Sequence, residues 1–290
     1  MGPISHTYVS QRLRLHFLEW GSASSPPLLL LHGGRDHCRS WDYFAERFSK
    51  NWRVICPDLR GHGDSEWVSD GNYEMAAYIY DLDQLIHQQK LAPLTIVAHS
   101  LGGNIALRYS GLFPENIKSL VAIEGLGFSP KMMDEREKRG LANRLRSWIS
   151  KRRDLAGRQV KKYSTVAQAI KRMQEENAHL TEKMANHLTV HGINQNEDGT
   201  YSWKFDNYVR AWPAYDMASD EIKKIWGAIE CPTLLVHGNE SWASDPEIDG
   251  RGKFFKNVQI EGFDNAGHWV HHDCPESCYE LVSGFIRDSS

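Results

Sequence analysis

The 290-residue sequence lacks a long hydrophobic stretch, and its longest apolar run covers only residues 26–31. A helix that spans a bilayer needs about 20 apolar residues, so no stable membrane insertion is expected. The first residues also lack the apolar core and the small-residue cleavage site of a secretory signal peptide. These absences argue against an integral membrane protein and predict a cytoplasmic location.

Cysteine and net charge are scarce as well, with five cysteines and a formal net charge of −3. An odd number of cysteines without an export signal indicates reduced thiols and not a disulfide framework. A small net charge gives no overall attraction to nucleic acid, so a small-molecule substrate is the expected partner. The sequence contains no internal repeat and specifies no oligomeric state.

Short apolar runs alternate with helical patterns along most of the chain. This alternation predicts an α/β fold, with a mostly parallel sheet flanked by helices. Several runs are continuously apolar, as expected for strands that are covered on both faces. Residues 8–20 predict an opening antiparallel ribbon. The other predicted strands are Pro27–His32, Trp52–Cys56, Leu94–Ala98, Leu120–Ile123, Thr233–His237 and Val258–Ile260.

Residues 129–215 differ from the rest, because strand patterns vanish there and amphipathic helical patterns take over. The pattern predicts a core made of residues 1–128 and 216–290, with a helical cap inserted at 129–215. Asp198-Gly199 indicates a turn within this insertion. One predicted helical face carries Leu141, Leu145, Trp148 and Ile149.

The first half of the insertion is basic, with 14 Lys or Arg against 4 Asp or Glu between residues 131 and 172. A solvated helix face is the simpler interpretation, since exposed helices tolerate charge. Steering of an anionic substrate, or contact with a phospholipid surface, is the alternative.

The main functional signal is an apolar strand that runs into Ala98-His-Ser100-Leu-Gly102, after which a helix begins. This small-x-Ser-x-small pattern is typical of a nucleophile elbow, here with Ala98 at the first small position. A nucleophile on such a tight turn has a strained backbone, and small neighbours avoid collisions. The turn also places Ser100 at a helix N-terminus, which favours a developing anion.

Two further segments fit an acyl-transfer site. Gly33 and Gly34 follow a predicted strand, and acyl transfer needs two backbone N–H groups directed at the oxyanion. Leu101 and Gly34 are the candidates for these donors, although Gly33-Gly34 also fits a plain tight turn. His268 follows the last predicted strand, where an imidazole can accept the proton of Ser100.

These motifs resemble the successive landmarks of the α/β-hydrolase superfamily, in the right order and over nearly the whole chain except the predicted cap. The resemblance implies a serine hydrolase with Ser100 as nucleophile and His268 as base. It also implies that the Asp58–Ser65 loop is structural, and it implies no metal or organic cofactor. The segments that carry it are His32–Gly34, Asp58–Ser65, Ala98–Gly102, Pro232–Gly238 and Ala266–Trp269.

The sequence departs from the family pattern at the acid. The usual position, three residues after the His-Gly pair of the penultimate strand, is Ser241, which cannot carry a charge. Glu124 lies at the end of the strand after the elbow, as in one branch of the haloalkane dehalogenases. It is preferred because a carboxylate at a buried strand end needs a partner, and His268 would be one. Glu240 and another carboxylate such as Asp245 remain alternatives.

The predicted activity is hydrolysis of a carboxylic ester or lactone of a small, apolar substrate through an acyl-enzyme on Ser100. Trp203, Trp242 and Trp269 are predicted to line the substrate pocket, or else to be ordinary core aromatics. Carbon–carbon bond hydrolysis of a diketone-type metabolite, or ligand binding without turnover, remain alternatives.

The segment from His271 to Cys278 contains two histidines and two cysteines, which at first suggests a metal site. Structural zinc sites favour tighter paired spacings, so no metal is predicted there.

Overall fold

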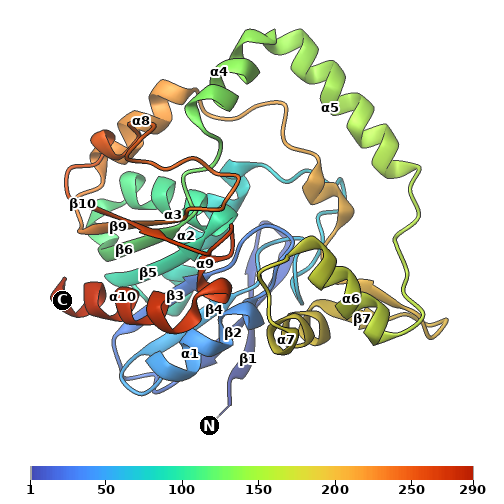
Figure 1. The fold of residues 1–290 in the computed structure, drawn as a ribbon, viewed down its shortest axis with the longest axis horizontal. Coiled ribbons are helices and arrows are strands. Elements are labelled where there is room, and N and C mark those ends of the chain that lie inside the picture. The colour runs from blue at the N-terminus through green and yellow to red at the C-terminus, as the bar shows by residue number, and fades with distance from the viewer. Residues whose placement is uncertain (1, 290) are drawn as a thin grey trace.

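The computed structural model describes residues 2–289 and contains an eight-stranded sheet with helices on both faces (Figure 1). The order across the sheet is β1-β2-β4-β3-β5-β6-β9-β10. β1 and β2 run antiparallel, β2 also pairs antiparallel with β4, and the strands from β4 to β10 are parallel. The predicted fold class is therefore confirmed. The strands are β1 (Ile4–Ser10), β2 (Leu13–Trp20), β3 (Pro27–Leu31), β4 (Arg53–Pro57), β5 (Leu94–His99), β6 (Ile117–Ile123), β9 (Thr233–Gly238) and β10 (Val258–Phe263).

Two hydrophobic cores lie on the two faces of this sheet, and β3 contributes to both. Leu29 and Leu31 point to one core, and Leu28 and Leu30 point to the other, because side chains alternate along a strand. This explains why β3 is continuously apolar. The first core includes α2 (Met75–Gln89), α3 (Ser100–Leu112) and α8 (Ser219–Ala228), and the second includes α1 (Asp42–Phe48) and α10 (Pro275–Asp288).

The strand order creates a switch point between β3 and β5. The chain leaves β3 to form β4 on one side, and then returns to form β5 on the other side of β3. Loops at the carboxyl ends of such strands part in opposite directions and leave a crevice, where ligands bind in open α/β sheets. The loops that carry Gly33-Gly34 and Ser100 both begin at this point.

Residues 129–215 contain α4 (Pro130–Lys138), α5 (Gly140–Ala156), α6 (Val166–Glu176) and α7 (Glu182–Gly192). In Figure 1 they arch beside the carboxyl edge of the sheet. The interpretation that strands vanish in this segment is wrong at one place, because β7 (Ile193–Gln195) pairs with β8 (Tyr201–Trp203). The predicted turn at Asp198-Gly199 closes this hairpin, and strands of three residues are too short for an alternating pattern to be visible.

The helix α5 is covered much less than its amphipathic pattern suggests. Leu141 and Ile149 are each 42% exposed, and Leu155 is the one residue of the helix that is buried. The side chain of Arg152 anchors α5 by donating hydrogen bonds to the backbone oxygens of Asp70 and Gly71.

No helix within residues 2–289 is long and apolar enough to cross a bilayer. The five cysteines are all free thiols. The remaining elements of the described chain are η1 (Cys38–Trp41), η2 (Pro114–Asn116), η3 (Asn207–Arg210), η4 (Gly252–Phe254) and α9 (Val270–Asp273).

Candidate active site

Ser100 occupies a sharp turn between β5 and α3. Its φ is +50°, a conformation that side-chain-bearing residues rarely adopt and that marks local strain. The neighbouring backbone passes very close, because a Cβ atom on Gly102 would lie 2.5 Å from the backbone oxygen of His32. The small residue two positions after Ser100 is therefore a steric requirement of the turn.

His268 lies on the loop between β10 and α9 and contacts both Ser100 and Glu124. Its Nδ1 is 3.1 Å from Glu124 Oε2, and its Nε2 is 2.8 Å from Ser100 Oγ. Because a carboxylate only accepts hydrogen bonds, Nδ1–H donates to Glu124, and the neutral imidazole then accepts from the hydroxyl of Ser100. The structure thus brings together one hydroxyl, one imidazole and one carboxylate from loops far apart in the sequence.

The side chain of Glu124 is fully buried. Two further groups donate hydrogen bonds to its carboxylate. Its Oε1 accepts from the Gly238 N–H at 2.8 Å, and its Oε2 accepts from Ser241 Oγ at 2.9 Å. Its φ of +53° turns the side chain toward these donors at the end of β6. Ser241, the residue at the usual acid position, therefore hydrogen-bonds to the carboxylate that contacts His268.

The alternative acids lie elsewhere. Glu240 is more than half exposed, and its carboxylate is 3.5 Å from His179. The carboxylate of Asp245 is 3.3 Å from His237 Nε2 and accepts from the backbone N–H of Glu247. Neither carboxylate forms an ion pair with His268 in the structure of residues 2–289.

His99, the residue before Ser100, supports the loop that carries His268. Its Nε2 donates to the backbone oxygen of His268 at 2.8 Å, and the two rings are 4.9 Å apart. Burial lowers the pKa of His99 well below its ordinary value, so this imidazole is neutral and acts as a fixed donor. This role was not predicted from the sequence. The available signal was an imidazole at the end of an otherwise apolar strand, where a buried polar group needs a partner.

Gly33 is required by the same packing, because a Cβ atom there would lie 2.7 Å from Nδ1 of His99. A Cβ atom on Gly34 would meet only the side chain of Leu101, at 3.8 Å. Gly34 and Leu101, the two predicted oxyanion donors, are thus neighbours beside Ser100. Leu101 lies in the first turn of α3, where N–H groups lack intrahelical acceptors.

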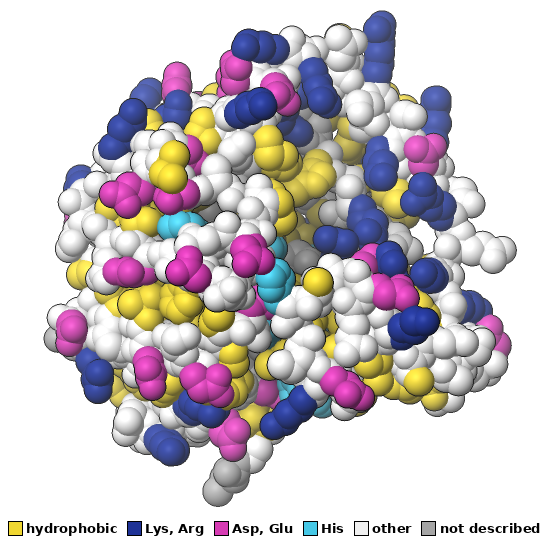
Figure 2. Space-filling model, in the orientation of Figure 1, with side chains coloured by type: hydrophobic (Ala, Val, Ile, Leu, Met, Phe, Trp, Pro, Cys, Tyr) yellow, Lys and Arg dark blue, Asp and Glu magenta, His cyan; other side chains and the backbone are white. Residues whose placement is uncertain are grey.

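The three predicted pocket tryptophans fall into two groups. Trp203 and Trp269 line one cavity, together with Arg35, the residue after Gly34. Trp242 does not line this cavity. Its ring lies 4.9 Å from the ring of His268, and the residue as a whole is 61% exposed. On the face seen in Figure 2, histidine side chains reach the surface near a hollow in the molecule, with Lys and Arg side chains on the side of residues 129–215.

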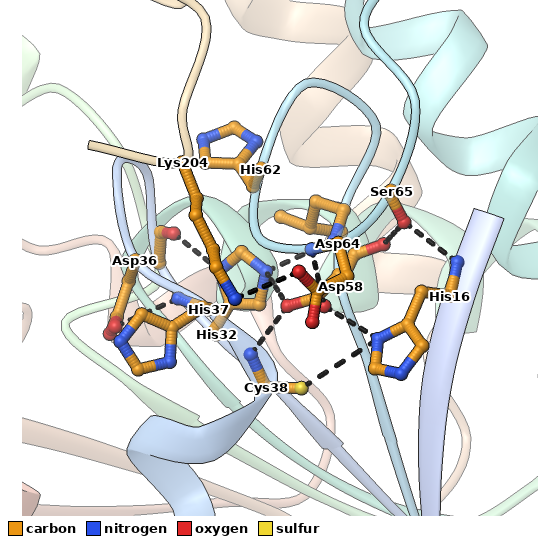
Figure 3. Close-up of polar contacts among 12 residues, drawn as sticks. His16, His32, Asp36, His37, Cys38, Asp58, His62, Asp64, Ser65 and Lys204 are labelled. Carbon is orange, nitrogen blue, oxygen red and sulfur yellow. Dashed lines mark hydrogen bonds and ion pairs between the residues drawn. The ribbon is translucent and has the colours of Figure 1, made fainter. Parts of the chain in front are cut away.

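The loop that begins at Asp58 is held by a dense set of hydrogen bonds (Figure 3). The buried carboxylate of Asp58 accepts from His16 Nδ1 at 2.7 Å and from the backbone N–H groups of Cys38 and Asp64. Burial opposes the charge of Asp58, but the hydrogen bond from His16, the neighbouring imidazole of His32 and the backbone N–H of Asp64 hold the pKa of Asp58 well below its ordinary value. These contacts tie the loop to β2 and η1, and none of them involves Ser100, Glu124 or His268, which agrees with the structural role that the resemblance implies.

Several known proteins are similar to this chain in sequence or in structure. An esterase of Mycobacterium tuberculosis, Rv0045c, is 25% identical and is matched over 98% of this chain and 90% of its own. A mouse protein named sn-1-specific diacylglycerol lipase ABHD11 is 26% identical over 92% of this chain and 82% of its own. The thioesterase domain from the curacin biosynthetic pathway superposes with a TM-score of 0.82 at 22% identity, covering 98% of this chain and all of the other.

The model of the alpha/beta hydrolase fold family matches residues 26–275. This range runs from β3, which precedes Gly33 and Gly34, to the first residue of α10, and it includes Ser100, Glu124 and His268. The chain belongs to the α/β-hydrolase family.

Proposed function

We propose that this protein is a serine hydrolase that cleaves a carboxylic ester, or a lactone, of a small and largely apolar substrate. The observation that carries the proposal is the hydrogen-bonded series from Ser100 Oγ through His268 to Glu124. A serine hydroxyl is a weak nucleophile unless an adjacent base removes its proton, and this arrangement supplies such a base. The names of two relatives, an esterase and a lipase, point to the same bond class.

The chemistry would proceed through an acyl-enzyme. His268 Nε2 takes the proton of Ser100 while Oγ attacks the carbonyl carbon, and Glu124 orients the imidazole and stabilises its cation. The N–H groups of Gly34 and Leu101 would hold the oxyanion. The imidazolium then returns its proton to the leaving alcohol, and water activated by His268 releases the carboxylic acid. These steps call on no metal or organic cofactor.

Residues 129–215 would act as a cap over this site, with residues 1–128 and 216–290 as the core. Trp203 from the segment and Trp269 from the core line the same cavity, next to Arg35. Large aromatic side chains with a few polar groups are typical of pockets for small apolar ligands. Trp242 would cover His268 from another side and exclude water from it.

Ser100→Ala tests the proposal directly. We expect kcat on short p-nitrophenyl acyl esters to fall roughly 10⁴- to 10⁶-fold, with the fold intact, because within residues 2–289 no other hydroxyl or thiol hydrogen-bonds to His268. A fluorophosphonate probe should label the natural protein and not this variant. Ser24→Ala, which changes an exposed turn residue, is the matched control.

The outcomes separate the alternatives. Near-normal turnover by Ser100→Ala would overturn the proposed mechanism. If the probe labels Ser100 and the protein cleaves a diketone but no ester, the protein is a carbon–carbon bond hydrolase. Absence of both labelling and turnover would indicate a ligand-binding protein.

A further inference from the structure

The helix α7 rests on the segment that follows Gly34 and leads into α1. His37 Nε2 donates to the backbone oxygen of Leu188 at 2.9 Å, and His187 Nε2 donates to the backbone oxygen of Arg39 at 3.0 Å. These contacts join residues 129–215 to the core and direct one face of α7 toward the start of α1.

Three potential metal ligands meet at this contact. Asp42 begins α1, and His187 and His191 lie one turn apart on α7 with ring centroids 4.7 Å apart. One ligand atom from each of the three residues lies within 4.8 Å of the other two, and His187 Nε2 is 3.4 Å from Asp42 Oδ2. All three residues are partly exposed, so an ion can reach them from solvent.

The polar groups in this cluster are incompletely paired. Asp42 Oδ2 accepts from Arg39, but Oδ1 is buried without a hydrogen-bond partner. A buried carboxylate oxygen without a partner is costly, and a bound cation would satisfy it. His191 makes no hydrogen bond with any other residue of the described chain, so its imidazole is free to act as a ligand.

The geometry points to a binding site for a divalent transition-metal ion formed by Asp42, His187 and His191. Two imidazoles and one carboxylate favour Zn²⁺, Co²⁺, Ni²⁺ or Cu²⁺ over Mg²⁺ or Ca²⁺, which prefer oxygen ligands. Side-chain rotations would bring the three ligand atoms within about 2.1 Å of one ion, and His187 Nε2 would exchange its hydrogen bond to the backbone oxygen of Arg39 for the ion. Arg39 is about one-third exposed, so its guanidinium can turn into solvent when the ion replaces it beside Asp42.

A second set of potential metal ligands shows by contrast why exposure and an unpaired carboxylate oxygen matter for ion binding. His16, Cys38 and Asp58 also lie close together, but all three are buried. Both oxygens of Asp58 already accept hydrogen bonds, from His16 Nδ1 and from the backbone N–H groups of Cys38 and Asp64 (Figure 3). That group offers an ion neither an unpaired carboxylate oxygen nor a path from solvent.

Metal binding at Asp42, His187 and His191 would link α7 to the core. An ion that binds the folded chain and not the unfolded chain raises folding stability with its concentration. The site is independent of Ser100, so it would be present whether or not the proposed ester chemistry is correct.

The test uses the full, untagged chain after chelator treatment, with Zn²⁺ binding measured by calorimetry and by thermal unfolding. We expect one Zn²⁺ per chain that is lost in His191→Gln and in Asp42→Asn, with affinity lower by at least roughly 10- to 100-fold. At about 100 times Kd, Zn²⁺ should raise Tm by roughly 5 °C in the natural chain. His87→Gln, an exposed histidine on α2, is the matched control and should bind normally.

Absorption of the Co²⁺-loaded protein identifies the ligands. Imidazole and carboxylate ligands predict visible d–d bands without the near-ultraviolet thiolate-to-cobalt band. Such a thiolate band, or undiminished Zn²⁺ affinity in both His191→Gln and Asp42→Asn, would overturn the proposal. Absence of Zn²⁺ binding to the natural chain would also overturn it. Ser100→Ala should bind Zn²⁺ normally, so failure of the proposed ester hydrolysis would leave this result unaffected.

Discussion

The carboxyl edge of the sheet and the helices α4 and α5 are held by different kinds of interaction. At the sheet edge, Glu124 is fully buried and contacts His268, Ser241 and the backbone of Gly238. In α5, one residue is buried, and none of the five Lys or Arg side chains forms an ion pair within residues 2–289.

The difference indicates where rigidity is needed. The proposed proton transfer from Ser100 to His268 requires groups held within hydrogen-bond distance, and a buried carboxylate with three partners would provide that. A segment with few buried apolar contacts opens at a low free-energy cost. We therefore expect the sheet edge to determine chemistry, while α4 and α5 adjust to the substrate and contribute little to stability.

The largest effect should come from removing the charge at the sheet edge. Glu124→Gln leaves His268 without a carboxylate beside Nδ1 and lets the imidazole adopt the wrong tautomer, so kcat should fall roughly 10³- to 10⁴-fold. Glu240→Gln changes only the contact with His179 and should alter kcat by less than about threefold. Steady-state kinetics on a p-nitrophenyl ester compares the kcat values of the two variants. A larger loss in Glu240→Gln than in Glu124→Gln would identify Glu240 as the acid.

Acid should weaken the core through its buried histidines. Burial lowers the pKa of His32 to about 3 and that of His272 to about 3, whereas both side chains titrate near 6.5 in an unfolded chain. Between these values the unfolded state binds more protons, so stability is fully present above about pH 6.5, falls as pH decreases and stops falling below about pH 3.

Thermal unfolding between pH 7 and pH 5 measures this effect, and we expect Tm to fall by roughly 10 °C. The window lies above the range in which Asp58 would take up a proton, so protonation of Asp58 does not contribute to the fall. His272→Phe should show a smaller fall than the natural chain. A constant Tm over this window would contradict the burial of neutral imidazoles.

The same substitution, Leu→Ala, compares the stability contributed by the core with that contributed by α5. Leu85 of α2 is fully buried, and Leu85→Ala should lower the free energy of unfolding by about 2–5 kcal/mol. Leu141 of α5 is 42% exposed, and Leu141→Ala should change it by less than about 0.5 kcal/mol. Urea unfolding of both variants checks the comparison. Equal losses would mean that the apolar face of α5 is covered in solution.

The sequence predicted the sheet, the elbow and the catalytic candidates because each depends on a local pattern. Continuous apolar runs located β3 and β5, and small residues around Ser100 indicated the turn. The sequence left more than one candidate for the acid because the partners of that residue are distant in the sequence, and only folding places Ser241 against Glu124. The pairing of Asp42 with His187 left no sequence signal for the same reason. The turn at Asp198-Gly199 was predicted, but the strands on either side of it were not, because each has only three residues.

Ser241 offers the smallest and most specific test of the sheet edge. Its hydroxyl donates to Glu124 from a partly exposed loop, so water can replace it when it is removed. Ser241→Ala should therefore cost roughly 2- to 10-fold in kcat, with KM unchanged, since a net hydrogen bond contributes about 0.5–1.5 kcal/mol. Ser241→Thr keeps the hydroxyl and should restore most of the rate. If Ser241→Ala were as damaging as Glu124→Gln, the carboxylate would depend on this donor for its position, and the buried strand end alone would not fix the acid.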